Sequence, residues 1–159
     1  MMKQQGDFLF TYQWPDQVPA DISTNGATIQ RDEGLETAVL VSVFSDTRAA
    51  DSDPLPDKGD EPRGWWGSDL LGIPLGSKLW LLSRSKLTSQ TLEQARQYIA
   101  DSLAWMVQDG MVDRVTVQAI RAPGDVNRAE FAVTLTRTKG LQVSFRFFYN
   151  WLNQIFGGN

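Results

Sequence analysis

The sequence of 159 residues predicts an α+β fold, a two-layer sandwich of a mostly antiparallel sheet with helices on one face. Residues 114–149 contain three strand patterns joined by short turns, which is typical of an antiparallel C-terminal three-strand meander. Residues 89–108 show the apolar spacing of an amphipathic helix. Hydrophobic residues make up 42% and charged residues 21%, so we expect a single domain over residues 1–159 with a buried core.

The first part of the chain predicts one strand and two short helices, and residues 27–30 allow a short second strand. Aromatic side chains alternate with other residues over 7–14, which indicates an N-terminal strand. Residues 33–45 carry apolar or small side chains at helical spacing and predict the first helix. Ser77 can cap a second, short helix that runs to residue 83.

The long helix has signals at both of its ends. Thr88 precedes it as the expected N-cap, and Gly110 follows it as the expected C-terminal stop. Its inward stripe is predicted to consist of five residues, namely Leu92, Ala95, Ile99, Ser102 and Met106. This spacing predicts one continuous helix over residues 89–108.

The meander is expected to be apolar on one face only. Its strands are predicted at residues 114–122, 129–138 and 141–149, and the face opposite the apolar one carries Thr, Gln and Arg. An edge strand of this sheet, or the N-terminal strand, could accept a strand from a partner. The alternative stays open, in which the edge is guarded by a charged side chain such as Arg146 or Lys139. Residues 157–159 are predicted to form a flexible tail.

The composition excludes several classes of function. The sequence has no Cys and no His, which removes imidazole and thiol catalysis, Cys/His zinc sites and disulfides. The net charge is −4 and the basic residues are scattered, which argues against nucleic-acid binding. No apolar run is long enough to cross a membrane, and no signal peptide is recognisable. We therefore expect no cofactor, no membrane contact and assembly in the cytoplasm.

The loop over residues 46–76 is the richest candidate for function. It contains the segment Glu61-Pro62-Arg63, followed by Trp65 and Trp66 between glycines. Pro62 fixes the backbone between opposite charges, and Arg63 can present a planar donor group to a partner. Trp and Arg dominate the energy of protein interfaces, so these five residues are predicted to bind a partner. The alternative stays open, in which Glu61 and Arg63 pair internally and the tryptophans fill the core.

The acidic residues of this loop suggest two other readings. A divalent cation could bind the cluster that consists of Asp51, Asp53, Asp57, Asp60 and Glu61. The spacing of a calcium loop is missing, so no metal site is predicted. Glu61 with Asp69 or Asp46 could form the carboxylate pair of a glycosidase, which would make the chain a peptidoglycan-cleaving enzyme. No pattern positions the second acid, so no catalytic residue is predicted.

Four segments in a fixed order resemble the small baseplate protein family of Mu-like contractile-tail phages and prophages. They are Thr37–Asp46, Asp53–Asp57, Arg63–Asp69 with its Arg-Gly-Trp-Trp-Gly sequence, and Gly76–Leu82, and the resemblance continues through the helix that follows Thr88. That family is similar to sheath-initiator wedge proteins, whose Glu-Pro-Arg motif is matched by Glu61-Pro62-Arg63. The resemblance implies that this motif docks the protein to the baseplate wedge and that a sheet edge starts sheath assembly.

The sequence and the resemblance together predict a non-enzymatic structural component of a contractile phage or prophage tail baseplate. The expected partners are other baseplate wedge proteins and tail tube or sheath subunits in a symmetric assembly, and the expected location is the tail baseplate of the virion. A lysozyme-like tail enzyme is the alternative. A free-standing regulatory binding module is a third class, which would have a specific partner outside any tail.

Overall fold

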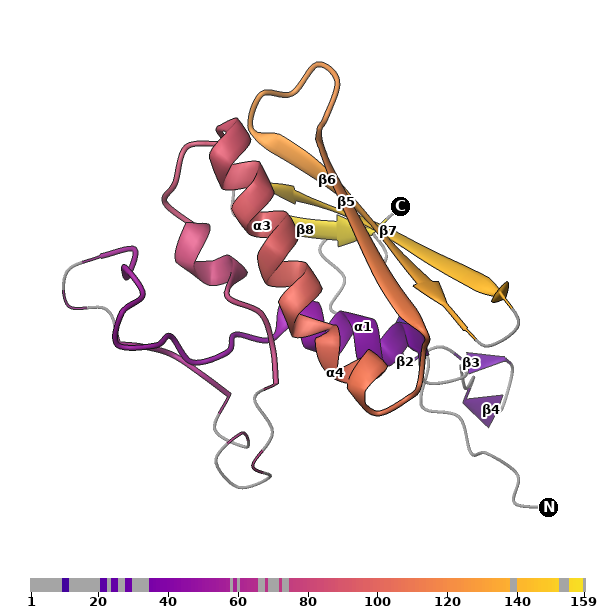
Figure 1. The fold of residues 1–159 in the computed structure, drawn as a ribbon. Helices are drawn as coiled ribbons and strands as arrows, with labels where there is room; N and C mark the ends of the chain where they lie inside the picture. Colours follow the sequence, from indigo (N-terminus) through magenta and orange to yellow (C-terminus); the bar gives the residue numbers. More distant parts are fainter. Residues whose placement is uncertain are drawn as a thin grey trace.

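The computed structural model describes residues 10–11, 21–22, 24–25, 28–29, 35–57, 59, 61–65, 68, 72, 75–137, 140–151 and 155–158. Its centre is a four-stranded antiparallel sheet in the order β5-β6-β7-β8 (Figure 1). β5 (Arg114–Arg121), β6 (Arg128–Thr136) and β7 (Gln142–Asn150) form the predicted meander, and β8 (Ile155–Gly158) adds to its edge. The α+β prediction is confirmed.

The two faces of the sheet differ as the alternation predicted. Register places Ala119, Phe131 and Phe147 side by side on one face, where Phe131 and Phe147 are buried. The helices cover this face, and residues from the helices and from three strands form one core cluster (Figure 1). The other face carries exposed polar side chains such as Thr116 and Gln118. The sequence therefore determines the layers through the period-two pattern of its strands.

The first helix is confirmed over α1 (Leu35–Phe44), which buries Leu35, Val39, Ser42 and Val43. The second is a 3₁₀ helix, η1 (Leu79–Leu82), whose four residues are all buried. Ser77 assists its start, since the Ser77 hydroxyl accepts the Leu79 N–H and donates to the Val43 carbonyl. None of the described helices is long and apolar enough to cross a membrane.

The prediction of one continuous helix over residues 89–108 is wrong at Leu103. The structure has α3 (Ser89–Ser102) and then α4 (Ala104–Gln108). The Ser102 hydroxyl donates to the Ile99 carbonyl, and the Leu103 N–H turns to the Ala100 carbonyl instead. This side-chain competition for a backbone acceptor tightens the turn and ends α3. Leu103 is fully buried there, whereas Ser102 of the predicted stripe is half-buried.

The signals at the two ends of this region are confirmed. The Thr88 hydroxyl accepts the Thr91 N–H at 3.1 Å, as expected of an N-cap. Gly110 follows α4 with a φ of +70°, a conformation that glycine adopts at low cost.

The expectation of a flexible tail is wrong for Gly157 and Gly158. Both belong to β8, where Gly157 pairs with Phe148 and Gly158 with Phe147. A side chain on Gly157 would collide with the Phe148 ring, so the missing side chain lets this ring lie over the edge strand. The remaining residue of the predicted tail, Asn159, lies outside the described residues.

The N-terminal part is described only as two small hairpins. β1 (Phe10–Thr11) pairs with β2 (Asp21–Ile22), and β3 (Thr24–Asn25) pairs with β4 (Thr28–Ile29). The rest of the strand predicted over residues 7–14 lies outside the described residues.

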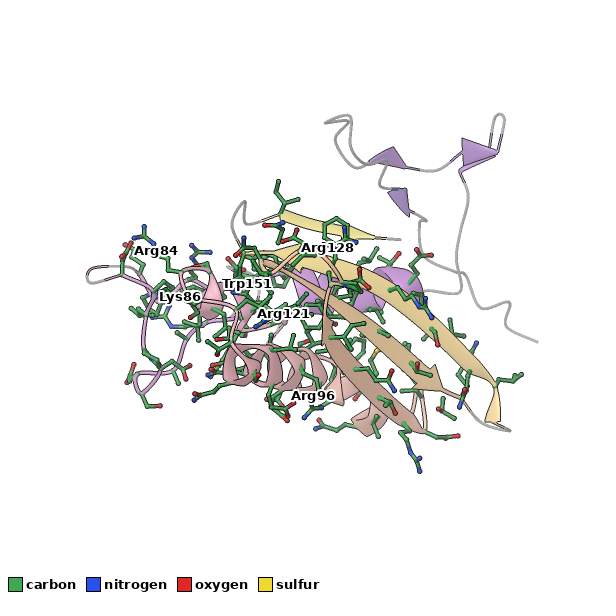
Figure 2. The ribbon with its side chains drawn as sticks, turned by 90° about the horizontal axis from the view of Figure 1, so that it is seen from above. Arg84, Lys86, Arg96, Arg121, Arg128 and Trp151 are labelled. Carbon is green, nitrogen blue, oxygen red and sulfur yellow. The ribbon has the colours of Figure 1, made fainter. Side chains whose placement is uncertain are left out.

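Two long side chains connect the helical layer to one end of the sheet through hydrogen bonds. Trp151 Nε1 donates to the Leu82 carbonyl at 3.0 Å, and the Arg121 guanidinium donates to the Leu87 carbonyl. Figure 2 shows Arg121 and Trp151 at the same end of the sheet. The segment from η1 to α3 is therefore fixed against the strands at both of its ends.

Candidate partner-docking site

The loop after α1 is held between two later segments of the chain. Asp46 and Ser77 form a parallel β-bridge, in which the Ser77 N–H donates to the Ser45 carbonyl at 2.8 Å and the Thr47 N–H donates to the Ser77 carbonyl at 3.1 Å. The Ala49 N–H donates to the Pro62 carbonyl at 2.9 Å. These bonds bring residues 46, 63 and 77 to one place although they are far apart in sequence.

Two glycines permit this close approach. Gly76 has a φ of +108°, and a Cβ there would lie 2.5 Å from the Ser45 carbonyl oxygen. Gly64 has a φ of +113°, and its Cβ would lie 3.0 Å from the Arg48 Cβ. A side chain at either position would force the neighbouring backbone or side chain to move.

The Arg63 side chain is the central group of this site. Its Nη1 lies 2.9 Å from Asp46 Oδ2, and its guanidinium lies over the Trp80 ring at 4.7 Å from the ring centroid. The Arg63 side chain is 48% exposed and the Asp46 side chain 43% exposed. We call these three residues the Arg63 platform. The guanidinium is thus oriented on two sides and still accessible to solvent.

Trp80 gives the Arg63 platform a rigid base. The residue is 6% exposed, and its Nε1 donates to the Thr47 carbonyl at 2.9 Å. Trp80 also packs with Ala49 and Leu81 in a small second core beneath the loop. A buried aromatic ring with its N–H satisfied has few alternative positions.

The Arg63 platform contributes little net stability. An exposed ion pair is worth about 0–1 kcal/mol. A cation–π contact at an exposed site adds about 0.5–1 kcal/mol. Arg63 is the only non-glycine residue in the described part of the chain with positive φ, at +43°, and this left-handed backbone costs about 1–2 kcal/mol. These terms nearly cancel, so stability alone does not explain why the arginine is held in this position.

A small cavity of about 150 Å³ opens beside the Arg63 platform. Val43, Phe44 and Leu79 supply apolar walls, while Arg63 and Tyr149 supply polar groups. Burial raises the pKa of the Tyr149 hydroxyl, which stays protonated at neutral pH. A cavity with apolar walls beside an accessible guanidinium suits a protein side chain that combines apolar and polar parts.

The five predicted binding residues differ in their exposure to solvent and in their contacts. Arg63 is exposed and oriented, Pro62 is half-buried and bonded through its carbonyl, and Glu61 is exposed. Trp65 is half-buried, and Trp66 lies outside the described residues. The internal partner of Arg63 is Asp46 and not Glu61, so the internal alternative is wrong about the residue involved.

Sequence reasoning missed the roles of Trp80 and Tyr149 in this site. Trp80 lies in an uninterrupted apolar run with Leu79, Leu81 and Leu82, a pattern that indicates burial and gives no sign of an exposed arginine above it. Tyr149 follows the strand period and looks like any core residue. Only the tertiary contacts bring both residues to Arg63.

Two acidic residues of the proposed cation cluster, Asp53 and Asp57, pair with cations of the chain. Lys78 Nζ lies 2.6 Å from Asp53 Oδ2, and Arg84 Nη2 lies 2.6 Å from Asp57 Oδ2. Among the described residues no group of three or more potential metal ligands occurs. Asp46, one suggested acid partner of Glu61, is held by Arg63, and the other, Asp69, lies outside the described residues.

The Asp53–Lys78 pair predicts a pH dependence. The hydrogen bond from Lys78 and then the bond from the Ala50 N–H lower the pKa of Asp53 below its ordinary value of 3.8. A carboxyl group with a lowered pKa stabilises the fold above its unfolded pKa of about 4, and this contribution disappears as the pH falls through the folded pKa. The loss of stability in Asp53→Asn should therefore be larger at about pH 7 than at about pH 3 in urea unfolding. A loss independent of pH would contradict this assignment.

The described site lies within a region that matches a known protein family. A family model described as phage protein GP46 matches residues 35–142. The chain belongs to this GP46 family. The matched region includes Asp46, Arg63 and Trp80 and ends before Tyr149.

Two relatives of this family member have informative names. Baseplate protein gp46 of Escherichia phage Mu is 48% identical over 99 residues, which cover 62% of this chain and 68% of the relative. Mu-like prophage FluMu protein gp46 of Haemophilus influenzae is 33% identical over 132 residues, which cover 82% of this chain and 89% of the relative. No solved structure matches the chain. The resemblance to the Mu-like baseplate family is therefore confirmed.

Proposed function

We propose that this GP46 family member is a non-enzymatic structural subunit of the tail baseplate in a contractile phage or prophage particle. The similarity to baseplate protein gp46 of phage Mu supports this role, because the two chains are 48% identical over 99 residues. The protein assembles in the host cytoplasm and ends in the virion tail. Its partners are neighbouring baseplate wedge proteins and tail tube or sheath subunits.

The Arg63 platform is the docking site for a neighbouring baseplate chain. The single observation that carries this proposal is the geometry of Arg63. Its backbone has an energetically unfavourable positive φ, while its side chain is held between Asp46 and Trp80 and remains half-exposed. The ion pair and the cation–π contact only offset the cost of the positive φ, so they add little to the stability of the fold. A contact with another protein therefore explains the orientation of Arg63 better than a contribution to stability does. Arginines that are pre-oriented in this way lose little entropy on binding and are frequent interface hot spots.

The neighbours of Arg63 contribute to the same docking surface. Glu61 is exposed beside it, and the Pro62 carbonyl fixes the segment to Ala49. Trp65 and Trp66 complete the segment in sequence and belong to the same proposed contact. An edge of the sheet then pairs with the first sheath subunits, because strand pairing through backbone groups provides a template that repeats around a ring.

Replacing Arg63 tests the docking role. The Arg63→Ala variant should keep its fold and lose co-elution with the co-expressed neighbouring baseplate proteins in size-exclusion chromatography. Loss of a hot-spot arginine costs about 2 kcal/mol or more, which weakens binding by about thirtyfold or more. Arg63→Lys should restore little, because a lysine lacks the planar donor group that stacks on Trp80.

Arg84→Ala is the matched control for this experiment. Arg84 is also exposed and also pairs with an aspartate, Asp57. Its loss should leave co-elution unchanged. If Arg63→Ala co-elutes with the partners as fully as Arg84→Ala does, the role of Arg63 is purely structural.

A further inference from the structure

The two edges of the sheet differ in how far they are covered. On one side, β8 pairs with β7 only from Phe147 to Asn150. No described strand lies beside residues 142–146 on that side. In Figures 1 and 2 this end of β7, next to the β6–β7 turn, projects away from β8 and from α3. We call residues Gln142–Arg146 the open half of β7.

The hydrogen bonds at both ends of β7 show which backbone groups the open half presents. The Trp151 N–H donates to the Asn127 carbonyl, and the Arg137 N–H donates to the Leu141 carbonyl. Both bonds follow the β6–β7 register and join odd-numbered residues. Neighbouring residues of a strand direct their backbone groups to opposite sides, so the N–H and C=O groups of Gln142, Ser144 and Arg146 point away from β6.

Burial along β7 agrees with this assignment. Phe147 and Tyr149 face the helices beside β8 and are buried, whereas Val143 and Phe145 on the same face are only half-buried. Gln142, Ser144 and Arg146 are exposed. The open half therefore has unpaired backbone groups next to incompletely buried apolar side chains, which is the combination that strand addition requires.

The opposite edge, β5, is less accessible. The Ala122 N–H donates to the Arg128 carbonyl, so even-numbered residues face β6 and the outward groups belong to Val115, Val117 and Ala119. α3 packs against this strand, and Val117 is only 7% exposed. A strand added at this edge would therefore meet a helix that already packs against β5.

We infer that an extended segment of a partner protein adds as a further strand along the open half of β7. Its apolar side chains lie against Val143 and Phe145 and complete the core at this end. On the other face it places an acidic side chain near Arg146, which forms no ion pair with any described residue. The inference rests on the proposed pairing with sheath subunits and specifies its location and the pattern of the incoming strand.

A proline at Ser144 tests this location. It removes an outward N–H and leaves the bonds between β6 and β7 in place. The probe is the sheath subunit from the same tail genes, co-expressed with each variant. Ser144→Pro should bind it at least about tenfold more weakly, the effect of about 1.4 kcal/mol, whereas Ser144→Ala, which loses only the hydroxyl contact with Thr134, should bind like wild type. Equal binding by the proline variant, if it has the wild-type melting temperature, would overturn the inference.

Amide hydrogen exchange of the unmodified protein gives a second test that does not depend on a variant folding. The Gln142, Ser144 and Arg146 amides should exchange fast in the free protein and slowly in the complex, and the outward β5 amides should not change. Protection of these amides in the free protein, or protection only at β5 in the complex, would overturn the inference while the proposed function stands. A wild-type chain that forms no complex with the sheath subunit would contradict the proposed sheath contact as well.

Discussion

The Gly76→Ala variant is expected to lose both stability and the geometry of the Arg63 platform. Gly76 has a φ of +108°, and its new Cβ would lie 2.5 Å from the Ser45 carbonyl oxygen and 2.9 Å from the Thr47 nitrogen. The backbone conformation alone costs about 1–3 kcal/mol with a side chain. The collision adds to this cost, because the atoms in the way are backbone atoms of the Asp46–Ser77 bridge.

The matched control is Gly124→Ala. Gly124 also has a positive φ, +82°, but a Cβ added there would meet no atom within 4 Å. Urea unfolding should show a clearly larger loss of stability for Gly76→Ala than for Gly124→Ala. Equal losses would mean that the backbone around Ser45 yields freely, and the bridge would then not be the element that positions Asp46.

Phe131→Ala is expected to cause the largest loss of stability among single core changes. Phe131 is 1% exposed at the centre of β6, and its ring stacks on Phe147 with 5.5 Å between ring centroids. Removing a buried phenylalanine costs about 3–5 kcal/mol. The total free energy of unfolding of a domain is about 5–15 kcal/mol, so this loss should lower the midpoint of urea unfolding steeply.

Thr116→Ala on the exposed face of the sheet is the control for this core change. Thr116 lies on β5 with its side chain exposed, so its loss should change stability by about 0.5 kcal/mol or less. Similar losses for the two variants would contradict the assignment of the buried face.

The sequence predicts those elements whose signal is local. The strands of the meander alternate apolar and polar residues, and Thr88 caps α3 through a residue three positions away. The break at Leu103 was missed because the Ser102 hydroxyl and the Leu103 N–H compete for the Ile99 carbonyl. The spacing of apolar residues contains no signal for this competition. β8 was missed because Gly157 and Gly158 carry no strand signal, and the pairing with β7 decides their conformation.

The candidate site shows the same limit. The sequence identifies Arg63 as a candidate from its residue type and its loop. Its internal partner is 17 positions away, and nothing in the spacing distinguishes Asp46 from the other acids of the loop. Trp80 comes still later in the chain and looks like a core residue. The contacts that orient Arg63 are therefore tertiary, and only the folded structure reveals them.

The measurement that tests the central claim most directly is the yield of complete tails. A tail gene cluster that carries Arg63→Ala in this gene is compared by electron microscopy with the wild type and with Arg84→Ala. The proposed docking role predicts that Arg63→Ala gives few or no complete contractile tails, while Arg84→Ala gives the wild-type yield. Complete tails at normal yield from Arg63→Ala would contradict the role of Arg63 in the baseplate.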